Sequence, residues 1–517
     1  MALIFLCLTG GTTSGLAQTG TAEAPAWTGP QAGDALYQLT SAVADAGAHG
    51  LNPFDYALLD LIALDPRYSD PDADRLATDT YLSLARDLLQ GRVAVDDPVR
   101  WPFAPRQRDL DAWLIEALET GTVADSLDAL APQMPDYRVL QTALLNLVHD
   151  GAGGTPVLIG PGEALEAGMS GERVDALRGR LETLGYLAPR EFGEPADATH
   201  SAVVFDDAMT EAVQAVQRDA HLEADGIAGE DTIEWLDTPD AVRVAQLRVN
   251  LERLRWLPDD LGARHIRVNL PDFRLQVFEG GVAVRSHDVI VGRRSRASPV
   301  LTATLTHIIA NPWWETPHSL AVRDELPLFR RDPGAVQRLG FQVIDRATGD
   351  VVDASGIDWA AVSASDFPYR LRQAPGPLNA LGQVKLIFPN PHNTYLHDTP
   401  SRALFERPER AFSSGCVRVR DPVALAQWAS EVGGGLDAAG VRAAIDSGRE
   451  TRIDIATPVR VHFLYLTAFA GEGGRAVFVP DLYGRDAAVL AALDAANDRV
   501  IPAIVEPETS IGCPALP

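Results

Sequence analysis

The spacing of apolar residues changes once along the chain, and this change limits the possible folds more than any other feature. Across residues 27–160 apolar residues recur at helical spacing, as Leu36 and Leu39 do, and each run ends near a glycine. After residue 263 they alternate instead, as Ile266 and Val268 do, which is the period of a half-buried strand. At 517 residues the chain has room for several domains. The sequence therefore predicts an α+β multidomain protein, with helices first and a mainly β domain after them.

A second helical unit is predicted over residues 165–240. Val174 and Leu181 lie on one face of a helix, and another helical pattern follows in "FDDAMTEAVQAVQ". The Asp225-Gly226 pair marks a turn before a short third helix. Three amphipathic helices can close a small core of their own, so this stretch is expected to form a separate three-helix domain.

The β part of the chain is interrupted by a charged and less regular insert at about residues 315–372. Strand patterns precede the insert in "VLTATLTHIIANP" and follow it in "QVKLIFP" and "TRIDIATPVRVHFL". The sequence thus predicts one mainly β domain over residues 263–485 with an inserted capping subdomain, which we interpret as a lid. Residues 486–517 are assigned to a C-terminal tail.

Residues 1–17 are predicted to be a signal peptide. The apolar run "ALIFLCL" is too short to span a bilayer but suits the core of a secretory signal, and Gly15-Leu16-Ala17 resembles a cleavage site. A positively charged start is missing, so the true N-terminus and the cleavage site stay open, as does the alternative of a frayed apolar end. No later stretch reaches about 20 consecutive apolar residues, which predicts no transmembrane segment.

Charge and cysteine usage narrow the chemistry. The 71 acidic residues exceed the 44 basic ones and give a net charge of −27, which argues against nucleic acid or an anionic membrane as the main partner. Only three cysteines occur, so disulfides are not expected to organise the fold, and Cys513, in a proline-flanked tail, has no evident role. Lys385 is the only lysine and therefore the single candidate for Schiff-base chemistry.

The stretch "SSGCVRVRDP" carries the best candidate nucleophile, Cys416. Gly415 allows unusual backbone angles and the close approach of a ligand, and Asp421 with Pro422 starts a helix just beyond. The thiol is thus expected on a strand or turn that leads into a helix, where side chains can face a cleft.

This thiol needs a base, because a thiol with a pKa near 8.5 is mostly protonated at neutral pH. His397, at the end of a strand pattern, is the natural partner, and a positioned general base contributes about 10²–10⁴-fold. The amides of Gly415 and Cys416 could stabilise an oxyanion. No carboxylate that orients His397 is evident, because adjacent side chains on a strand, such as Asp398, point to opposite faces.

The stretch "HDTPSRALFERPERAFSSGCVRV" resembles the active-site signature of L,D-transpeptidases with a YkuD-type catalytic domain. Residues 165–240, with "LGYL", "FDDAMTEAV" and "DGIAGEDT", resemble the three-helix peptidoglycan-binding domain. The order of helical scaffold, wall-binding domain and catalytic domain with a capping insert is similar to the large Gram-negative members of that family. Ser414 stands where many members carry a second histidine. The positions that match the signature are His397, Ser413, Gly415, Cys416 and Arg418.

The resemblance implies a peptidoglycan L,D-transpeptidase of the periplasm. The thiol would attack the third residue of a tetrapeptide stem, release D-alanine and pass the acyl group to a diaminopimelate amine of another stem, which forms a 3→3 cross-link. The nucleophile would be Cys416, the base His397, and the oxyanion amide that of Gly415. The resemblance implies no cofactor and no metal, peptidoglycan as the partner, and carbapenems as covalent ligands. Substrate contacts are assigned to Tyr395, Ser413, Ser414 and Arg418.

Three alternatives stay open. Water in place of the amine would make the chain an L,D-carboxypeptidase or hydrolase that uses the same thioester. The helical front and the binding domain would also suit a non-catalytic wall-binding scaffold. A zinc site built from His392, His397 and Cys416 is a third reading, although no short-spaced ligand pair supports it. The acceptor, any attachment of lipoprotein to the wall, and the oligomeric state are not determined by the sequence.

Overall fold

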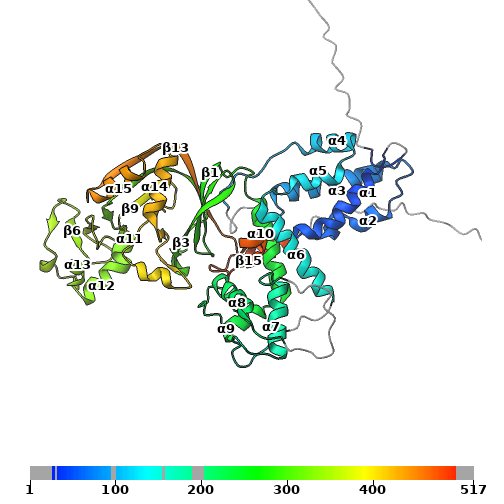
Figure 1. Cartoon of the computed structure of the whole chain (residues 1–517). Helices are drawn as coiled ribbons and strands as arrows, with labels where there is room; N and C mark the ends of the chain where they lie inside the picture. The colour runs from blue at the N-terminus through cyan, green and yellow to red at the C-terminus, as the bar shows by residue number, and fades with distance from the viewer. Residues whose placement is uncertain (1–25, 30–31, 95–100, 154–157, 189–202, 496–517) are drawn as a thin grey trace, which may run out of the picture.

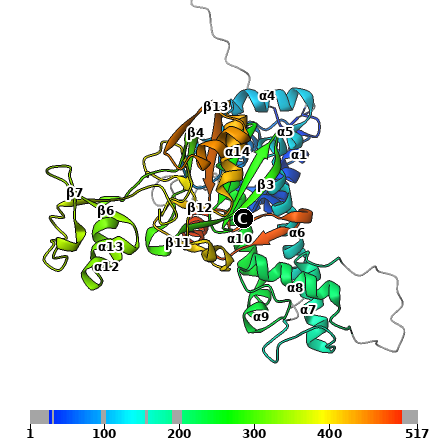
Figure 2. The ribbon, with the colours of Figure 1, turned by 60° about the vertical axis from the view of Figure 1, so that its left-hand side comes forward.

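The structure, a computed structural model, describes residues 26–29, 32–94, 101–153, 158–188 and 203–495 (Figure 1). The predicted signal peptide, residues 1–17, and Cys513 lie outside these ranges. Figures 1 and 2 show the N-terminal helices at one end, a large sheet in the middle and the charged insert at the other end. The three-helix domain lies below the junction of the N-terminal helices and the sheet.

The described N-terminal region has six α-helices, of which the first five pack on one another and the sixth packs on helix α10 (Asp240–Arg255) and the hairpin of β14 (Ala468–Ala470) and β15 (Ala476–Phe478). In the longest of them, the Asp70 carboxylate accepts hydrogen bonds from the amides of Asp72 and Ala73, and Pro71 occupies the first helical position. Both features stabilise a helix start. The helices are α1 (Ala35–Ala44), α2 (Leu58–Ala63), α3 (Pro71–Gln90), α4 (Leu110–Thr120), α5 (Val123–Leu130) and α6 (Pro135–Gly153).

The three-helix domain consists of α7 (Glu172–Thr183), α8 (Asp207–Asp219) and α9 (Glu230–Leu236). Its buried apolar residues form a hydrophobic cluster separate from that of the rest of the chain. Gln217 holds the turn before α9, because its side chain donates to Asp225 Oδ1 (2.8 Å) and accepts from the amide of Gly226 (2.9 Å). The separate core explains why this stretch can be recognised in the sequence by itself.

Helix α10 (Asp240–Arg255) joins the three-helix domain to the sheet, and the sequence analysis assigns no helix there. Four of its charged side chains are buried together with its leucines and valines. The C-terminal half of α10 is buried on all sides, so it has no polar face and lacks the amphipathic period that reveals a surface helix. The buried charged residues are Arg243, Glu252, Arg253 and Arg255.

The C-terminal half of the chain is built on a nine-stranded sheet with the order β11-β3-β12-β10-β9-β4-β13-β1-β2. The last strand also pairs with β3, so the sheet curls back on itself. Helices α14 (Pro422–Val432) and α15 (Ala438–Asp446) pack against it. The strands are β1 (Arg264–Asn269), β2 (Arg274–Glu279), β3 (Val282–Gly292), β4 (Leu301–Ala310), β9 (Val384–Ile387), β10 (Leu396–His397), β11 (Ala411–Ser413), β12 (Val417–Val419) and β13 (Thr451–Leu464).

The insert between β4 and β9, here called the cap, folds around a hydrophobic cluster of its own. A four-stranded sheet with the order β5-β8-β6-β7 is flanked by short helices. Its elements are β5 (Trp314–Glu315), α11 (His318–Leu320), the π-helical turn η4 (Ala321–Glu325), α12 (Leu326–Arg331), α13 (Ala335–Arg338), β6 (Phe341–Asp345), β7 (Val351–Val352) and β8 (Tyr369–Gln373).

The C-terminal boundary set by the sequence analysis at residue 485 is wrong. After the hairpin β14 (Ala468–Ala470) and β15 (Ala476–Phe478), the chain forms helix α16 (Asp486–Ala495), which packs on α10. Val489 and Leu493 are buried there, and the Asp486 carboxylate accepts a hydrogen bond from Arg253 (2.6 Å). In the alanine-rich run "DAAVLAALDA" the two buried residues lie among small ones. No amphipathic pattern is therefore evident, and the sequence predicts a tail.

The predicted α+β multidomain class is confirmed. One continuous hydrophobic core runs from Trp27 of the helical bundle through α10 and the large sheet to Leu493 of α16. Within the described ranges, no helix combines the length and the apolar composition required to cross a bilayer.

Candidate active site

Cys416 lies in the middle of the large sheet, directly before β12. Val417, the next residue, pairs with Leu396 of β10, and its amide donates to the carbonyl of Tyr395 (3.2 Å). Cys416 and Tyr395 are therefore neighbours on adjacent strands. Beyond β12 the Asp421 carboxylate caps α14, so the chain runs from strand to helix as the sequence predicts. The thiol is half-buried and is the free cysteine of the described residues.

A row of three side chains crosses the strands beside the thiol. His397 of β10 is paired with Arg418 of β12 on one side and with Lys385 of β9 on the other. Paired residues, and residues two apart on one strand, lie on the same face of a sheet. The row therefore shares its face with Cys416 and Tyr395. Strand spacing and rise place the Cα atoms of Cys416 and His397 roughly 8 Å apart, within reach of their side chains.

The ring of His397 is held by the backbone. Its Nδ1 lies 2.5 Å from the carbonyl oxygen of Asp398, and since a carbonyl only accepts, Nδ1 carries the proton. The other nitrogen, Nε2, then has its lone pair free. The Asp398 carboxylate is engaged elsewhere, with the amides of Gln383 and Thr399 and with Arg402. The orienting group that the sequence analysis could not find is thus a carbonyl.

Burial keeps both reacting groups neutral. Desolvation, followed by the charge of Arg418, lowers the pKa of His397 to about 3. Desolvation also raises the pKa of Cys416, although hydrogen bonds from Tyr395 and the charges of Lys385 and Arg418 act in the opposite direction. The pair is therefore a neutral thiol beside a neutral imidazole.

Tyr395 joins the thiol, the base and the cap. Burial, followed by the charge of Cys416, raises the pKa of Tyr395, whereas Trp314 of β5 lowers it, and the Tyr395 ring centroid lies 5.5 Å from that of His397. The residue assigned to substrate contact is thus a direct neighbour of the nucleophile.

The loop before the thiol corrects two assignments. The buried Ser413 hydroxyl donates to the carbonyl of Cys416 (2.5 Å) and accepts from the amide of Gly415 (3.1 Å). The Gly415 amide, assigned to the oxyanion, is therefore already used, and Ser413 holds the loop instead of facing a substrate. The amide of Cys416 has no hydrogen bond within the described residues. Gly415 has φ +115°, a backbone angle that favours glycine.

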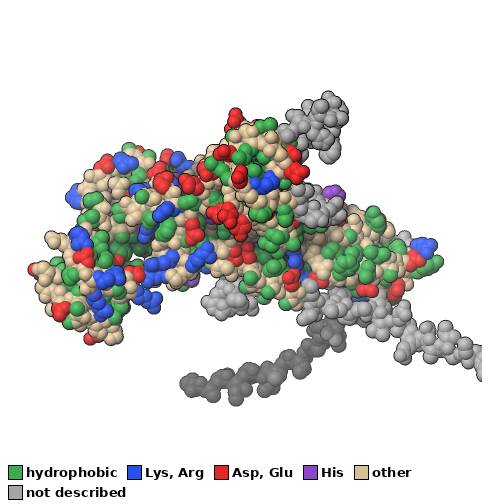
Figure 3. Space-filling model, turned by 90° about the horizontal axis from the view of Figure 1, so that it is seen from below, with side chains coloured by type: hydrophobic (Ala, Val, Ile, Leu, Met, Phe, Trp, Pro, Cys, Tyr) green, Lys and Arg blue, Asp and Glu red, His purple; other side chains and the backbone are tan. Residues whose placement is uncertain are grey.

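Ser414, also assigned to substrate contact, is exposed and bridges to the cap. Its hydroxyl accepts from Arg293 (3.2 Å) and Arg296 (3.0 Å), and both arginines pair with Asp324 of η4. Figure 3 shows basic side chains gathered on the face where the cap meets the large sheet. An anionic ligand would be attracted to this part of an otherwise acidic protein.

Arg418 differs from three of the arginines near the motif. Arg402, Arg410 and Arg420 each pair with a carboxylate. Arg418 forms no such pair with a described residue, and its buried Nε lacks a hydrogen-bond partner among them. A half-buried guanidinium without a carboxylate beside the thiol suits the recognition of a ligand carboxylate.

The residues of the zinc alternative do not come together. His392 is exposed in the loop between β9 and β10 and lines a cavity of about 780 Å³ whose walls include neither His397 nor Cys416. In the described part of the chain, no three histidine, cysteine, aspartate or glutamate side chains are grouped so that they could hold a metal ion.

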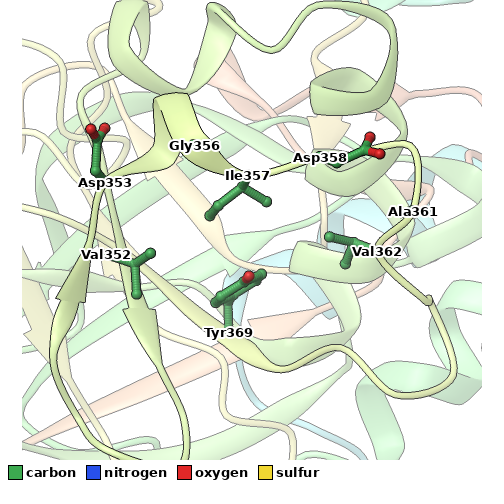
Figure 4. Close-up of a pocket in the computed structure, with 8 residues that line it drawn as sticks. All are labelled: Val352, Asp353, Gly356, Ile357, Asp358, Ala361, Val362 and Tyr369. Atoms are coloured by element: carbon green, nitrogen blue, oxygen red, sulfur yellow. The ribbon is translucent and has the colours of Figure 1, made fainter.

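The cap contains a second pocket of about 460 Å³, shown in Figure 4. Its lining is largely apolar, and the close-up shows the carboxylates of Asp353 and Asp358 turned away from its centre. None of the motif residues lines it, so the chemistry is assigned to the face of the large sheet. The lining residues are Val352, Asp353, Gly356, Ile357, Asp358, Ala361, Val362 and Tyr369.

Two neighbours of the thiol, Lys385 and Trp314, were not assigned to the site from the sequence. Lys385 faces Cys416 from β9, and Trp314 reaches it through Tyr395. Lys385 carried a usable signal, because it is the only lysine of the chain. The sequence gives no such signal for Trp314, since its strand belongs to the insert.

Three family models match the chain in succession. Residues 19–144 match a model described as "Scaffold domain", residues 170–236 one described as "Putative peptidoglycan binding domain", and residues 263–461 one described as "L,D-transpeptidase catalytic domain". The last range contains every motif residue discussed above.

A protein of Haemophilus influenzae named "Putative L,D-transpeptidase" is 38% identical over 241 residues. The match covers 47% of this chain and 48% of that protein, so the chain spans about half the length of the curated relative it matches. A crystal structure of an L,D-transpeptidase from Xylanimonas cellulosilytica is 16% identical and covers 59% of this chain and 99% of its own. Its TM-score of 0.16 is too low to support any comparison of the two folds.

The resemblance seen in the sequence is thus confirmed at the level of domains, and the order of the domains is the expected one. The chain carries a scaffold domain, a peptidoglycan-binding domain and a catalytic domain of the YkuD-type L,D-transpeptidase family.

Proposed function

We propose that the chain is a peptidoglycan L,D-transpeptidase of the periplasm that uses Cys416 as its nucleophile. The observation that carries the proposal is the single face of the sheet that holds Cys416, Tyr395 and His397, with His397 oriented by the Asp398 carbonyl. This arrangement supplies a nucleophile, a base with a free lone pair, and a base orienter, which acyl transfer requires.

In the first half-reaction, the Sγ proton passes to Nε2 of His397 as Sγ attacks the carbonyl of the third residue of a tetrapeptide stem. The carbonyl electrons move to oxygen, and the amide of Cys416 is the donor left to stabilise that oxyanion. When the intermediate collapses, the bond to the terminal D-alanine breaks. His397 returns its proton to the leaving amine, and a thioester remains on Cys416.

In the second half-reaction, a diaminopimelate amine of another stem attacks the thioester. Its proton passes to His397, the bond from carbon to sulfur breaks, and the sulfur regains a proton. The product is a 3→3 cross-link. Arg418 is proposed to pair with a carboxylate of the stem, and the three-helix domain to hold the chain on the wall.

The nucleophile is tested by intact-mass measurement after incubation with a carbapenem. The wild-type protein is expected to gain one covalent adduct, and Cys416→Ala to gain none, because no other described thiol exists. Cys513→Ser is the matched control, since it also removes one thiol and is expected to keep the adduct. An adduct on Cys416→Ala would show that another group is the nucleophile.

The cap is proposed to favour the amine over water as the acceptor, because closing a site excludes water. Thr316 donates to the carbonyl of Leu371 (2.9 Å), so residues 317–370 can be replaced by an Asn-Gly hairpin, with Leu371→Ser to avoid an exposed apolar residue. Hydrolysed stems are expected to increase relative to cross-linked dimers in muropeptide mass spectra.

An unchanged ratio of hydrolysis to cross-linking in the cap deletion would contradict the proposal that the cap acts as a lid. If the wild-type protein released D-alanine without forming dimers, the same thioester would serve an L,D-carboxypeptidase. Full cross-linking by Cys416→Ala would instead favour the wall-binding scaffold.

A further inference from the structure

The fold places the only lysine of the chain next to the reactive thiol. The chain has 44 lysine and arginine residues, and the other 43 are all arginines. Lys385 lies on β9, directly opposite His397, and its Nζ is 3.8 Å from the centroid of the Tyr395 ring. Tyr395 is the cross-strand neighbour of Cys416, because the amide of Val417 donates to the Tyr395 carbonyl (3.2 Å), so one aromatic ring lies between the ammonium and the thiol.

The charge of Lys385 is not neutralised locally. Its Nζ forms no hydrogen bond or ion pair with a described residue, although the side chain is half-buried. The carboxylate that acts on it most is that of Glu450, which is itself engaged with the amide of Trp313 (2.7 Å). A half-buried cation without an anionic partner costs free energy. Such a cost is tolerated where the charge is needed during the reaction.

The charged and titratable groups that face Cys416 come from three strands. They are Lys385 on β9, Tyr395 directly before β10, His397 on β10, and Arg418 on β12, with Arg293 beyond Arg418. Of the two cations, Lys385 has the larger effect on the sulfur, whereas Arg418 has the larger effect on His397. Both cations thus act on both partners of the proton transfer, Lys385 more on the sulfur and Arg418 more on the ring.

Building on the proposed function, we propose that Lys385 is the positioning residue that balances the negative charge on Cys416 when the Sγ proton passes to Nε2 of His397. In this step the S–H bond breaks and an N–H bond forms, so the sulfur gains one negative charge and the ring one positive charge. The ammonium, which lies over the Tyr395 ring, stabilises the sulfur anion.

A lysine suits this place better than an arginine. An ammonium is a compact point charge that fits over the Tyr395 ring, whereas a guanidinium is a wide planar fork made for bidentate partners. No described carboxylate lies there that a guanidinium could bind through two hydrogen bonds. A chain that otherwise uses arginine throughout therefore has a physical reason for a lysine at this position.

The proposal is tested by titrating the thiol through its alkylation. The rate at which iodoacetamide modifies Cys416 is measured against pH, with the modified peptide quantified by mass spectrometry so that Cys513 does not interfere. Lys385→Met is expected to raise the pKa of the thiol by about one unit. Lys385→Arg, which keeps the charge, is expected to stay within a few tenths of a unit of the wild type, and Arg452→Met, which removes an exposed charge from β13, to leave the pKa unchanged.

The same variants are compared in the rate of acylation by a carbapenem. A drop of roughly tenfold is expected for Lys385→Met, with partial recovery in Lys385→Arg. A residue that only fills space would slow both variants alike and leave the thiol pKa unmoved. If Lys385 instead binds a stem carboxylate, Lys385→Met would raise KM without moving the pKa. Either result would overturn the proposal.

If Lys385→Met does not fold, the same coupling can be measured through the pKa of Lys385. Because coupling between two protons is reciprocal, Cys416→Ala is expected to lower the pKa of Lys385 in the alkaline range. Reductive methylation of the single lysine against pH reports that pKa by intact mass, and an unshifted value would overturn the proposal. Neither titration needs a stem or a carbapenem, so a failed carbapenem test would reject the proposed function alone.

Discussion

Replacing His397 by glutamine is expected to slow the acylation of Cys416 by about 10²–10⁴-fold, the usual contribution of a positioned general base. Glutamine keeps the size of the side chain and can still donate to the Asp398 carbonyl, but it offers no lone pair that can take up a proton. The measurement is the pseudo-first-order rate of adduct formation with a carbapenem, followed by intact mass.

His392→Gln is the matched control for this variant, because His392 is exposed and lies five positions earlier on the same loop and strand unit. It is expected to retain the wild-type rate. Since burial lowers the pKa of His397 to about 3, the base stays neutral, and the wild-type rate should show no acidic limb between about pH 5 and pH 8. If His397→Gln reacted at the wild-type rate, His397 would not be the general base.

Replacing Glu252 by glutamine is expected to lower the free energy of unfolding by about 3–5 kcal/mol, because it leaves a buried charge unpaired. Glu252 and Arg255 are both fully buried on α10, 2.5 Å apart. The Glu252 carboxylate also accepts from the amide of Val93 (2.7 Å) and from Trp256 Nε1 (3.2 Å). Urea unfolding followed by tryptophan fluorescence measures the change.

The double variant Glu252→Met/Arg255→Met tests the cause of this loss. If the unpaired guanidinium is responsible, removing it as well should restore part of the stability, although the Tyr137 hydroxyl then loses the donor that Arg255 supplies (3.0 Å). Asp454→Asn breaks an exposed pair with Arg452 and is expected to leave the transition unchanged. A single variant as stable as the wild type would show that the pair does not support the core.

The helical and strand regions could be predicted because their apolar periods are local properties of the sequence. Helices α10 and α16 could not, because the C-terminal half of α10 is buried on all sides and the buried Val489 and Leu493 of α16 lie among alanines. The cysteine and histidine stood out because a short motif surrounds them. In each case the outcome depended on whether the relevant neighbours lie close along the chain.

The same limit explains the errors at the site. The loop around Gly415 looks open in the sequence, but its amide is taken by Ser413, whose hydroxyl folds back only in three dimensions. The orienting carbonyl of Asp398 is a backbone atom and leaves no trace in side-chain chemistry. Lys385 joins the site through the register of β9 with β10, which no local pattern specifies.

Because β12 pairs with β3 and β9 pairs with β4, the reactive face of β9, β10 and β12 depends on strand pairings between distant parts of the chain. Such pairings form late during folding, after long loops have closed. In a newly made or denatured molecule, the Cys416 thiol is therefore expected to react only as slowly as an ordinary cysteine thiol. Reactivity should return during renaturation in step with the whole sheet, which makes the thiol a built-in reporter of correct maturation.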